Sequence, residues 1–255
     1  MFSRILTAFA VLAVIFLSAS WAGAETTSLT VMVKSKDAKF VGTSMGGVLI
    51  TVRDADTEEV LDSGVTAGGT GDTSLIMRTP RERGRAMATD GAARFTAEVD
   101  IDEPTLVEVS AFGPLAQRQS AARASVTQWV IPGRDVTRGD ALTLELPGFV
   151  VDVLAPGAAS GVAGDSVTIE ANVTMMCGCP ITPGGLWDSD GFEITAIVKR
   201  NGRVVGEMPL EYAGRPSTFS GAYQVPGKGT YEVVVFAFDP DNGNAGVDRT
   251  TFSVG

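Results

Sequence analysis

The stretch DSVTIEANVTM, residues 165–175, alternates between apolar and polar side chains along its length. The apolar phase consists of Val167, Ile169, Ala171 and Val173, and the polar phase of Ser166, Thr168, Glu170 and Asn172. A period of two is typical of a β-strand that buries one face and exposes the other. We therefore expect a strand here whose apolar side chains point into the core of a β-sandwich.

Similar short runs, rich in Val, Thr, Leu and Ile and bounded by Gly, Pro or Asp, recur along the chain. Their spacing is typical of antiparallel sandwiches, and no segment after the first 24 residues has helical periodicity. Two Pro-Gly pairs, at 147–148 and 156–157, flank a new apolar run and predict a boundary near residue 148. The fold class we predict is all-β, with two antiparallel β-sandwich domains in series, residues 25–147 and 148–255.

The first 24 residues predict export. Arg4 supplies a positive charge, residues 5–18 form an apolar run of signal-peptide length, and Ala-Gly-Ala ending at Ala24 is a small-residue cleavage site. The apolar run is shorter than the ~20 residues that a membrane-spanning helix needs, so a retained anchor is the weaker interpretation. We expect cleavage after Ala24 and a mature chain, without a membrane anchor, in the periplasm or outside the cell.

Each half of the mature chain resembles a known family. Residues 46–66, followed after an insertion by an Asp-Gly-x-x-x-Phe turn and strand within 89–113, are similar to transthyretin-like, carboxypeptidase regulatory-type sandwiches. Residues 163–173, 198–207 and 229–254 resemble a bacterial immunoglobulin-like or fibronectin type III-like domain. Both resemblances imply a fold; neither implies an activity.

The immunoglobulin resemblance implies a particular arrangement of strand F. Such domains carry a corner tyrosine there, with a cysteine two residues later that pairs with strand B. Tyr231 fits the corner position, but the residue two positions on is Val233. The usual inter-sheet disulfide is therefore absent. The chain has only two cysteines, Cys177 and Cys179, which within one chain pair with each other or stay free.

The segment TMMCGC, residues 174–179, holds both cysteines and two of the eight methionines. If the strand continues, Met175, Cys177 and Cys179 share the core phase, while Met176 points the other way. Three interpretations stay open. One is a Cu(I) site, because copper in this oxidation state prefers soft sulfur ligands such as these four side chains. Another is a local Cys177–Cys179 disulfide, because exported cysteines tend to be oxidised. The third is that both thiols stay free or pair between molecules.

Two polar loops lie at the same predicted end of the second domain. In an immunoglobulin-like sandwich the B–C and F–G loops are neighbours. Carboxylate and amide oxygens so placed are suitable ligands for Ca²⁺, although Asp and Asn are also ordinary turn residues. The candidate calcium ligands are Asp188 and Asp190 in the first loop and Asp239, Asp241 and Asn242 in the second.

An insertion near residues 67–88 interrupts the first domain and is strongly basic. Four arginines lie close together in it: Arg78, Arg81, Arg83 and Arg85. Arginine forks bind carboxylate and phosphate groups, so the loop is a candidate contact for an anion or a partner. A solvated loop without a ligand is the alternative.

Strand F is apolar on both faces. Tyr231, Val233, Val235 and Ala237 have the core phase, and the outward phase holds Val234, Phe236 and Phe238, which Ile197 of the neighbouring strand joins. Burying such a side chain stabilises the folded protein by about 1.5–3 kcal/mol. A face exposed to water would lose this stabilisation. We predict that the first domain or a partner protein covers Ile197, Val234, Phe236 and Phe238. The alternative is that a register break at Phe236 turns these side chains inward, or that a nearby loop covers them.

Composition narrows the class of function. The net charge of −10 argues against a nucleic-acid partner, because phosphate binding needs a basic surface. The chain has no histidine, which excludes His-ligated metals and Ser-His hydrolases despite the Gly-Thr-Ser-Met-Gly motif at 42–46. We expect an exported, non-enzymatic binding protein that contacts another protein and carries the Cu(I) site. The alternative is a structural or assembly module of a cell-surface or periplasmic complex, with the local disulfide.

Overall fold

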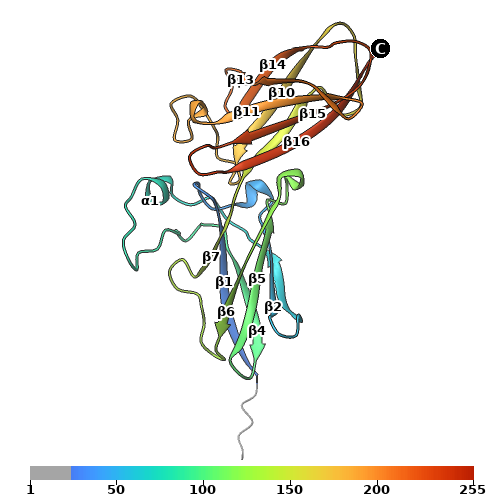
Figure 1. The fold of residues 1–255 in the computed structure, drawn as a ribbon. Coiled ribbons are helices and arrows are strands. Elements are labelled where there is room, and N and C mark those ends of the chain that lie inside the picture. Colours follow the sequence, from blue (N-terminus) through green and yellow to red (C-terminus); the bar gives the residue numbers. More distant parts are fainter. Residues whose placement is uncertain (1–23) are drawn as a thin grey trace, which may run out of the picture.

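The computed structural model describes residues 24–255, and Figure 1 shows two β-sandwiches stacked end to end. Four sheets make up almost all of the regular structure, which confirms the predicted all-β class. The expected signal peptide lies outside the described residues, apart from Ala24. Within residues 24–255, no helix has the length and apolar character to cross a membrane.

The N-terminal sandwich uses seven strands in two sheets, with orders β4-β1-β7 and β3-β2-β5-β6. All of its strand pairs are antiparallel except β1–β7, which is parallel. The strands are β1 (Glu25–Ser35), β2 (Leu49–Asp54), β3 (Val60–Val65), β4 (Phe95–Ile101), β5 (Thr105–Gly113), β6 (Ala122–Val130) and β7 (Leu142–Leu146).

The C-terminal sandwich has a four-stranded sheet, order β13-β14-β10-β8, and a five-stranded sheet, order β12-β11-β15-β16-β9. Only the β16–β9 pair is parallel. The strands are β8 (Phe149–Ala155), β9 (Ser160–Val162), β10 (Ser166–Met175), β11 (Glu193–Arg200), β12 (Arg203–Pro209), β13 (Glu211–Tyr212), β14 (Thr218–Gln224), β15 (Gly229–Phe238) and β16 (Ala245–Val254).

The alternating stretch from Ser166 to Met175 forms β10, in the middle of its sheet between β14 and β8. Val167, Ile169, Ala171 and Val173 are buried in the C-terminal core, as the period of two predicts. From the facing sheet, Tyr231 on β15 stacks on Phe252 with ring centroids 5.1 Å apart. The Tyr231 hydroxyl donates to the carbonyl of Gly227, which is the local contact expected of a corner tyrosine.

The basic insertion contains the one α-helix of the described residues, α1 (Thr73–Met77), which periodicity does not predict. Its single turn begins because the carboxylate of Asp72 accepts a hydrogen bond from the backbone N–H of Leu75 (2.6 Å) and caps the first turn. Three short 3₁₀ turns complete the regular structure: η1 (Thr43–Met45), η2 (Arg118–Ser120) and η3 (Ser189–Gly191).

Candidate functional site at the domain junction

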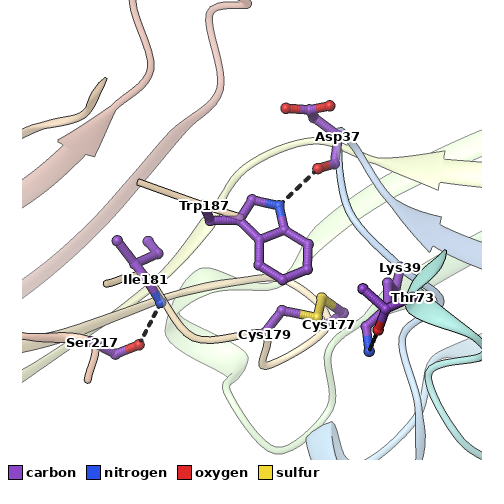
Figure 2. The surroundings of a disulfide bond; sticks show 8 residues. All are labelled: Asp37, Lys39, Thr73, Cys177, Cys179, Ile181, Trp187 and Ser217. Atoms are coloured by element: carbon purple, nitrogen blue, oxygen red, sulfur yellow. Dashed lines mark hydrogen bonds between the residues drawn. A yellow bond between two sulfur atoms is a disulfide. The ribbon is translucent and has the colours of Figure 1, made fainter. Parts of the chain in front are cut away.

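Cys177 and Cys179 form a disulfide, and the described chain has no free cysteine (Figure 2). Of the three interpretations that the sequence leaves open, the structure contains the local disulfide. Both side chains are buried among residues of the C-terminal core. The sulfurs therefore lie inside the protein at the end of the sandwich that meets the N-terminal domain.

The turn that closes this disulfide begins where β10 ends. The N–H of Met175 donates to the carbonyl of Cys179, and the N–H of Gly178 donates to the carbonyl of Met175 (2.8 Å). Gly178 has a φ of +74°, a region that side chains with a Cβ avoid. A Cβ at Gly178 would also meet the Met45 sulfur of the N-terminal domain at 2.6 Å. The glycine thus allows both the turn and the close approach of the other domain.

The two methionines beside the disulfide serve different domains. Met175 is buried in the C-terminal core together with both cysteines. Met176 is buried in the N-terminal core, beside Val150 and Leu146. This is the alternation that strand register predicts for consecutive residues. The segment therefore joins the two cores. The side chains of Met175 and Met176 point to opposite sides of the strand.

Trp187 fixes the same loop to the first domain. Figure 2 shows its indole N–H donating to the carbonyl of Asp37, at 2.9 Å. Trp187 is only 7% exposed and belongs to the C-terminal core, as does Ala38, which follows Asp37 in the chain. On the other side of the disulfide, the N–H of Ile181 donates to the hydroxyl of Ser217. The loop is thereby held from both domains.

The F–G loop, residues 239–244, also lies at the junction. The Lys36 ammonium donates to the carbonyl of Asn242 (2.6 Å), and the side-chain oxygen of Asn244 accepts from the N–H of Gly148 (3.0 Å). Asn244 is fully buried. These bonds join a loop of the second domain to the end of β1 and to the connection between the domains.

Three of the five candidate calcium ligands accept hydrogen bonds within their own turns. One Asp188 oxygen accepts from the N–H groups of Gly184 and Asp190, and one Asp239 oxygen accepts from the N–H of Asp241. The side chain of Asn242 accepts from the N–H of Asn244. Residues 24–255 contain no group of three or more His, Cys, Asp or Glu side chains placed to hold a metal ion. The calcium site stays a prediction from sequence.

The pKa of the Asp37 carboxyl, at the junction, is raised above its ordinary value. Partial burial is the main cause, and the negative charge of Asp239 raises the pKa further, while Lys34 and Lys36 oppose the shift. The side chain is nevertheless exposed, so solvent screens the repulsion. Asp37 contributes to the junction through its backbone carbonyl, the acceptor for Trp187, rather than through its charge.

The outward face of strand F is not covered by the first domain. Ile197 and Val234 are directly paired across β11 and β15, and Phe236 pairs with Val247 on β16. Ile197, Val234, Phe236 and Phe238 are half-buried, Val247 is 40% exposed, and none of the five packs against the hydrophobic cores of residues 24–255. A partner protein as the cover of this face stays a prediction.

The arginines of the insertion divide into two groups. Arg81, Arg83 and Arg85 line a hollow of about 560 Å³, which Arg138 from a distant turn completes. Arg78 follows α1 as its last-turn cap and does not line the hollow. The structure thus brings together three of the four arginines that the sequence singles out.

Sequence reasoning missed the residues that join the domains: Met45, Asp37, Lys36 and Trp187. Trp187 had a usable signal, since a lone tryptophan in a polar, glycine-rich loop commonly anchors that loop in a core. Met45, Asp37 and Lys36 have no such signal in the sequence, because their roles depend on which loops of the two domains meet.

Comparisons with known proteins found distant similarity to solved structures. No family model and no curated protein matches the chain. Among solved structures, it resembles the fibronectin(III)-like modules of Clostridium thermocellum CbhA (16% identity, 93% of this chain and 92% of that one, TM-score 0.27). A marsupial T cell receptor also matches (10% identity, 90% and 73%, TM-score 0.30). An engineered protein matches at 19% identity, 46% of this chain and 22% of its own length, with a TM-score of 0.33. The all-β sandwich fold rests on the chain's own strands and sheets.

Proposed function

We propose that this protein is an exported, non-enzymatic assembly module that docks another protein on the outward face of β11, β15 and β16. The observation that carries the proposal is the apolar surface there, formed by Ile197, Val234, Phe236, Phe238 and Val247. Monomeric proteins rarely expose contiguous apolar patches larger than roughly a few hundred Å². Export by the signal peptide and a carboxypeptidase regulatory-type origin of the N-terminal domain belong to the same proposal.

The chemistry of this face favours a different protein over a second copy. Its charges are already paired, since Glu232 lies 3.3 Å from Lys199 and 3.8 Å from Arg249. An apolar, uncharged surface of a partner therefore fits it best. Two copies of a chain with a net charge of −10 repel each other, which disfavours self-association.

Replacing Val234 by Lys together with Phe236 by Glu is expected to release the protein from its complex, because a docked apolar partner would have to bury two charges. The measurement is sedimentation of the tagged protein in an extract of its own cells: the wild type should sediment with a partner and the double variant as a monomer. Leu154→Lys, at an exposed leucine of the other sheet, is the matched control and should behave as the wild type.

Three results would contradict this assignment. The wild-type protein could sediment as a monomer in the extract, or the double variant could keep the wild-type complex. The purified wild type could also self-associate through this face, which would identify the occupant as a second copy. Circular dichroism of each purified variant establishes that its sandwiches are folded.

A second candidate function is Cu(I) binding by the reduced protein, and the position of Met45 favours it. Its sulfur lies against Gly178, between the two cysteines in sequence, so three residues could offer soft ligands from one turn and the facing domain. Reduction by a dithiol would convert the disulfide to two thiols, with the dithiol itself oxidised. Cu(I) would then displace the thiol protons.

Under this second candidate, the oxidised protein should show no free thiol, and the reduced protein should bind one equivalent of Cu(I). Changing both Cys177 and Cys179 to Ser should abolish binding without altering the β-rich circular dichroism. Met45→Leu and Met175→Leu identify the third ligand, since each removes one sulfur and keeps the volume. Failure of the reduced protein to outcompete a weak Cu(I) chelator would eliminate the copper function and leave the docking proposal untouched.

A further inference from the structure

The basic insertion meets a second loop that sequence reasoning did not connect to it. Asp140 accepts hydrogen bonds from the backbone N–H groups of Met87 (2.7 Å) and Ala88 (2.8 Å) through one carboxylate oxygen. This carboxylate ties the end of the insertion to the turn before β7. The hollow of about 560 Å³ lies between the two loops and is lined by Arg81, Glu82, Arg83, Gly84, Arg85, Ala86, Arg138, Gly139 and Asp140.

The lining carries an excess of positive charge in an acidic protein. Four arginines and two carboxylates line the hollow, which leaves a net charge of 4 − 2 = +2. The carboxylates are already engaged: Asp140 holds two backbone N–H groups, and Glu82 lies 3.7 Å from Arg85. Arg83 and Arg138 form no salt bridge within residues 24–255. Their guanidinium groups are free to bind a ligand.

We propose that this hollow binds the phosphoryl group of a phosphate monoester, or a pyrophosphate group, carried on a larger organic body. The excess charge of +2 matches a phosphate monoester dianion, and guanidinium forks bind phosphate oxygens in pairs. The hollow is open to solvent, since all four arginines are exposed, and its volume of about 560 Å³ exceeds that of a phosphate alone. The site is independent of the apolar docking face, which is on the other domain.

The direct test is titration of the full mature chain with pyrophosphate at low ionic strength. The wild type should bind one equivalent. Arg83→Gln combined with Arg138→Gln should weaken the affinity about tenfold or more, because each variant removes charge-assisted hydrogen bonds. Arg78→Gln is the matched control, since Arg78 belongs to the same insertion but does not line the hollow. Its affinity should stay within about twofold of the wild type.

A second experiment distinguishes a phosphorylated lipid from a soluble phosphorylated compound as the ligand. Vesicles of phosphatidylcholine with phosphatidic acid present a lipid phosphate monoester, and pure phosphatidylcholine vesicles do not. Binding to the former that pyrophosphate displaces would identify a lipid ligand, whereas binding of pyrophosphate alone would identify a soluble phosphorylated compound. The proposal is overturned if the folded wild type binds neither probe, or if Arg78→Gln weakens binding as much as the double variant.

Discussion

Trp187→Ala is expected to lower the free energy of unfolding by about 3–5 kcal/mol, the usual cost of removing a large aromatic side chain from a core. Trp187 is 7% exposed and packs in the C-terminal core, yet its indole N–H is bonded to the N-terminal domain. The substitution therefore opens a cavity and removes a hydrogen bond between the domains. Urea denaturation followed by far-ultraviolet circular dichroism measures the effect.

The chain supplies its own control for this experiment. Trp129 on β6 is 61% exposed, so Trp129→Ala should change stability by no more than about 0.5 kcal/mol. Trp187→Phe keeps most of the buried ring and loses the N–H donor, so its cost should fall between those of the two alanine variants. Equal costs for Trp187→Ala and Trp129→Ala would show that the tryptophan does not anchor the B–C loop.

Patterns local to one strand could be predicted from the sequence. The alternation of Val167, Ile169, Ala171 and Val173 predicted which face of β10 is buried, and Tyr231 occupies the predicted corner. Such features depend only on the period of a strand and on a short turn. Pairing of the two cysteines was one of three interpretations, because their count permits it without requiring it.

Contacts between segments distant in the chain could not be predicted. Nothing near Met45 indicates that it faces Gly178, and nothing near Arg138 indicates that it completes a hollow with the insertion. Each contact depends on where two loops end in space, which strand periodicity does not encode. The cover of the apolar face was left open between a domain and a partner for the same reason. An alternating pattern identifies an outward apolar phase, but not what lies against it.

Replacing Met175 by Ala and replacing Met176 by Ala should destabilise different domains. Both are essentially fully buried, so each substitution should cost about 2–5 kcal/mol. Met175 packs in the C-terminal core and Met176 in the N-terminal core, although only one peptide bond separates them. Native-state hydrogen exchange can distinguish the two effects, because local opening is reported strand by strand.

Met176→Ala should accelerate exchange in β1 and β5, whose side chains Val33 and Val109 share its core, more than in β14. Met175→Ala should do the reverse and affect β14, where Phe219 shares the C-terminal core, more than β1. Each variant is thus the control for the other, with the same side chain removed at the same burial. If both variants accelerated exchange only in the C-terminal strands, Met176 would not be a part of the N-terminal core. The disulfide loop would then be an appendage of one domain rather than the connection between two.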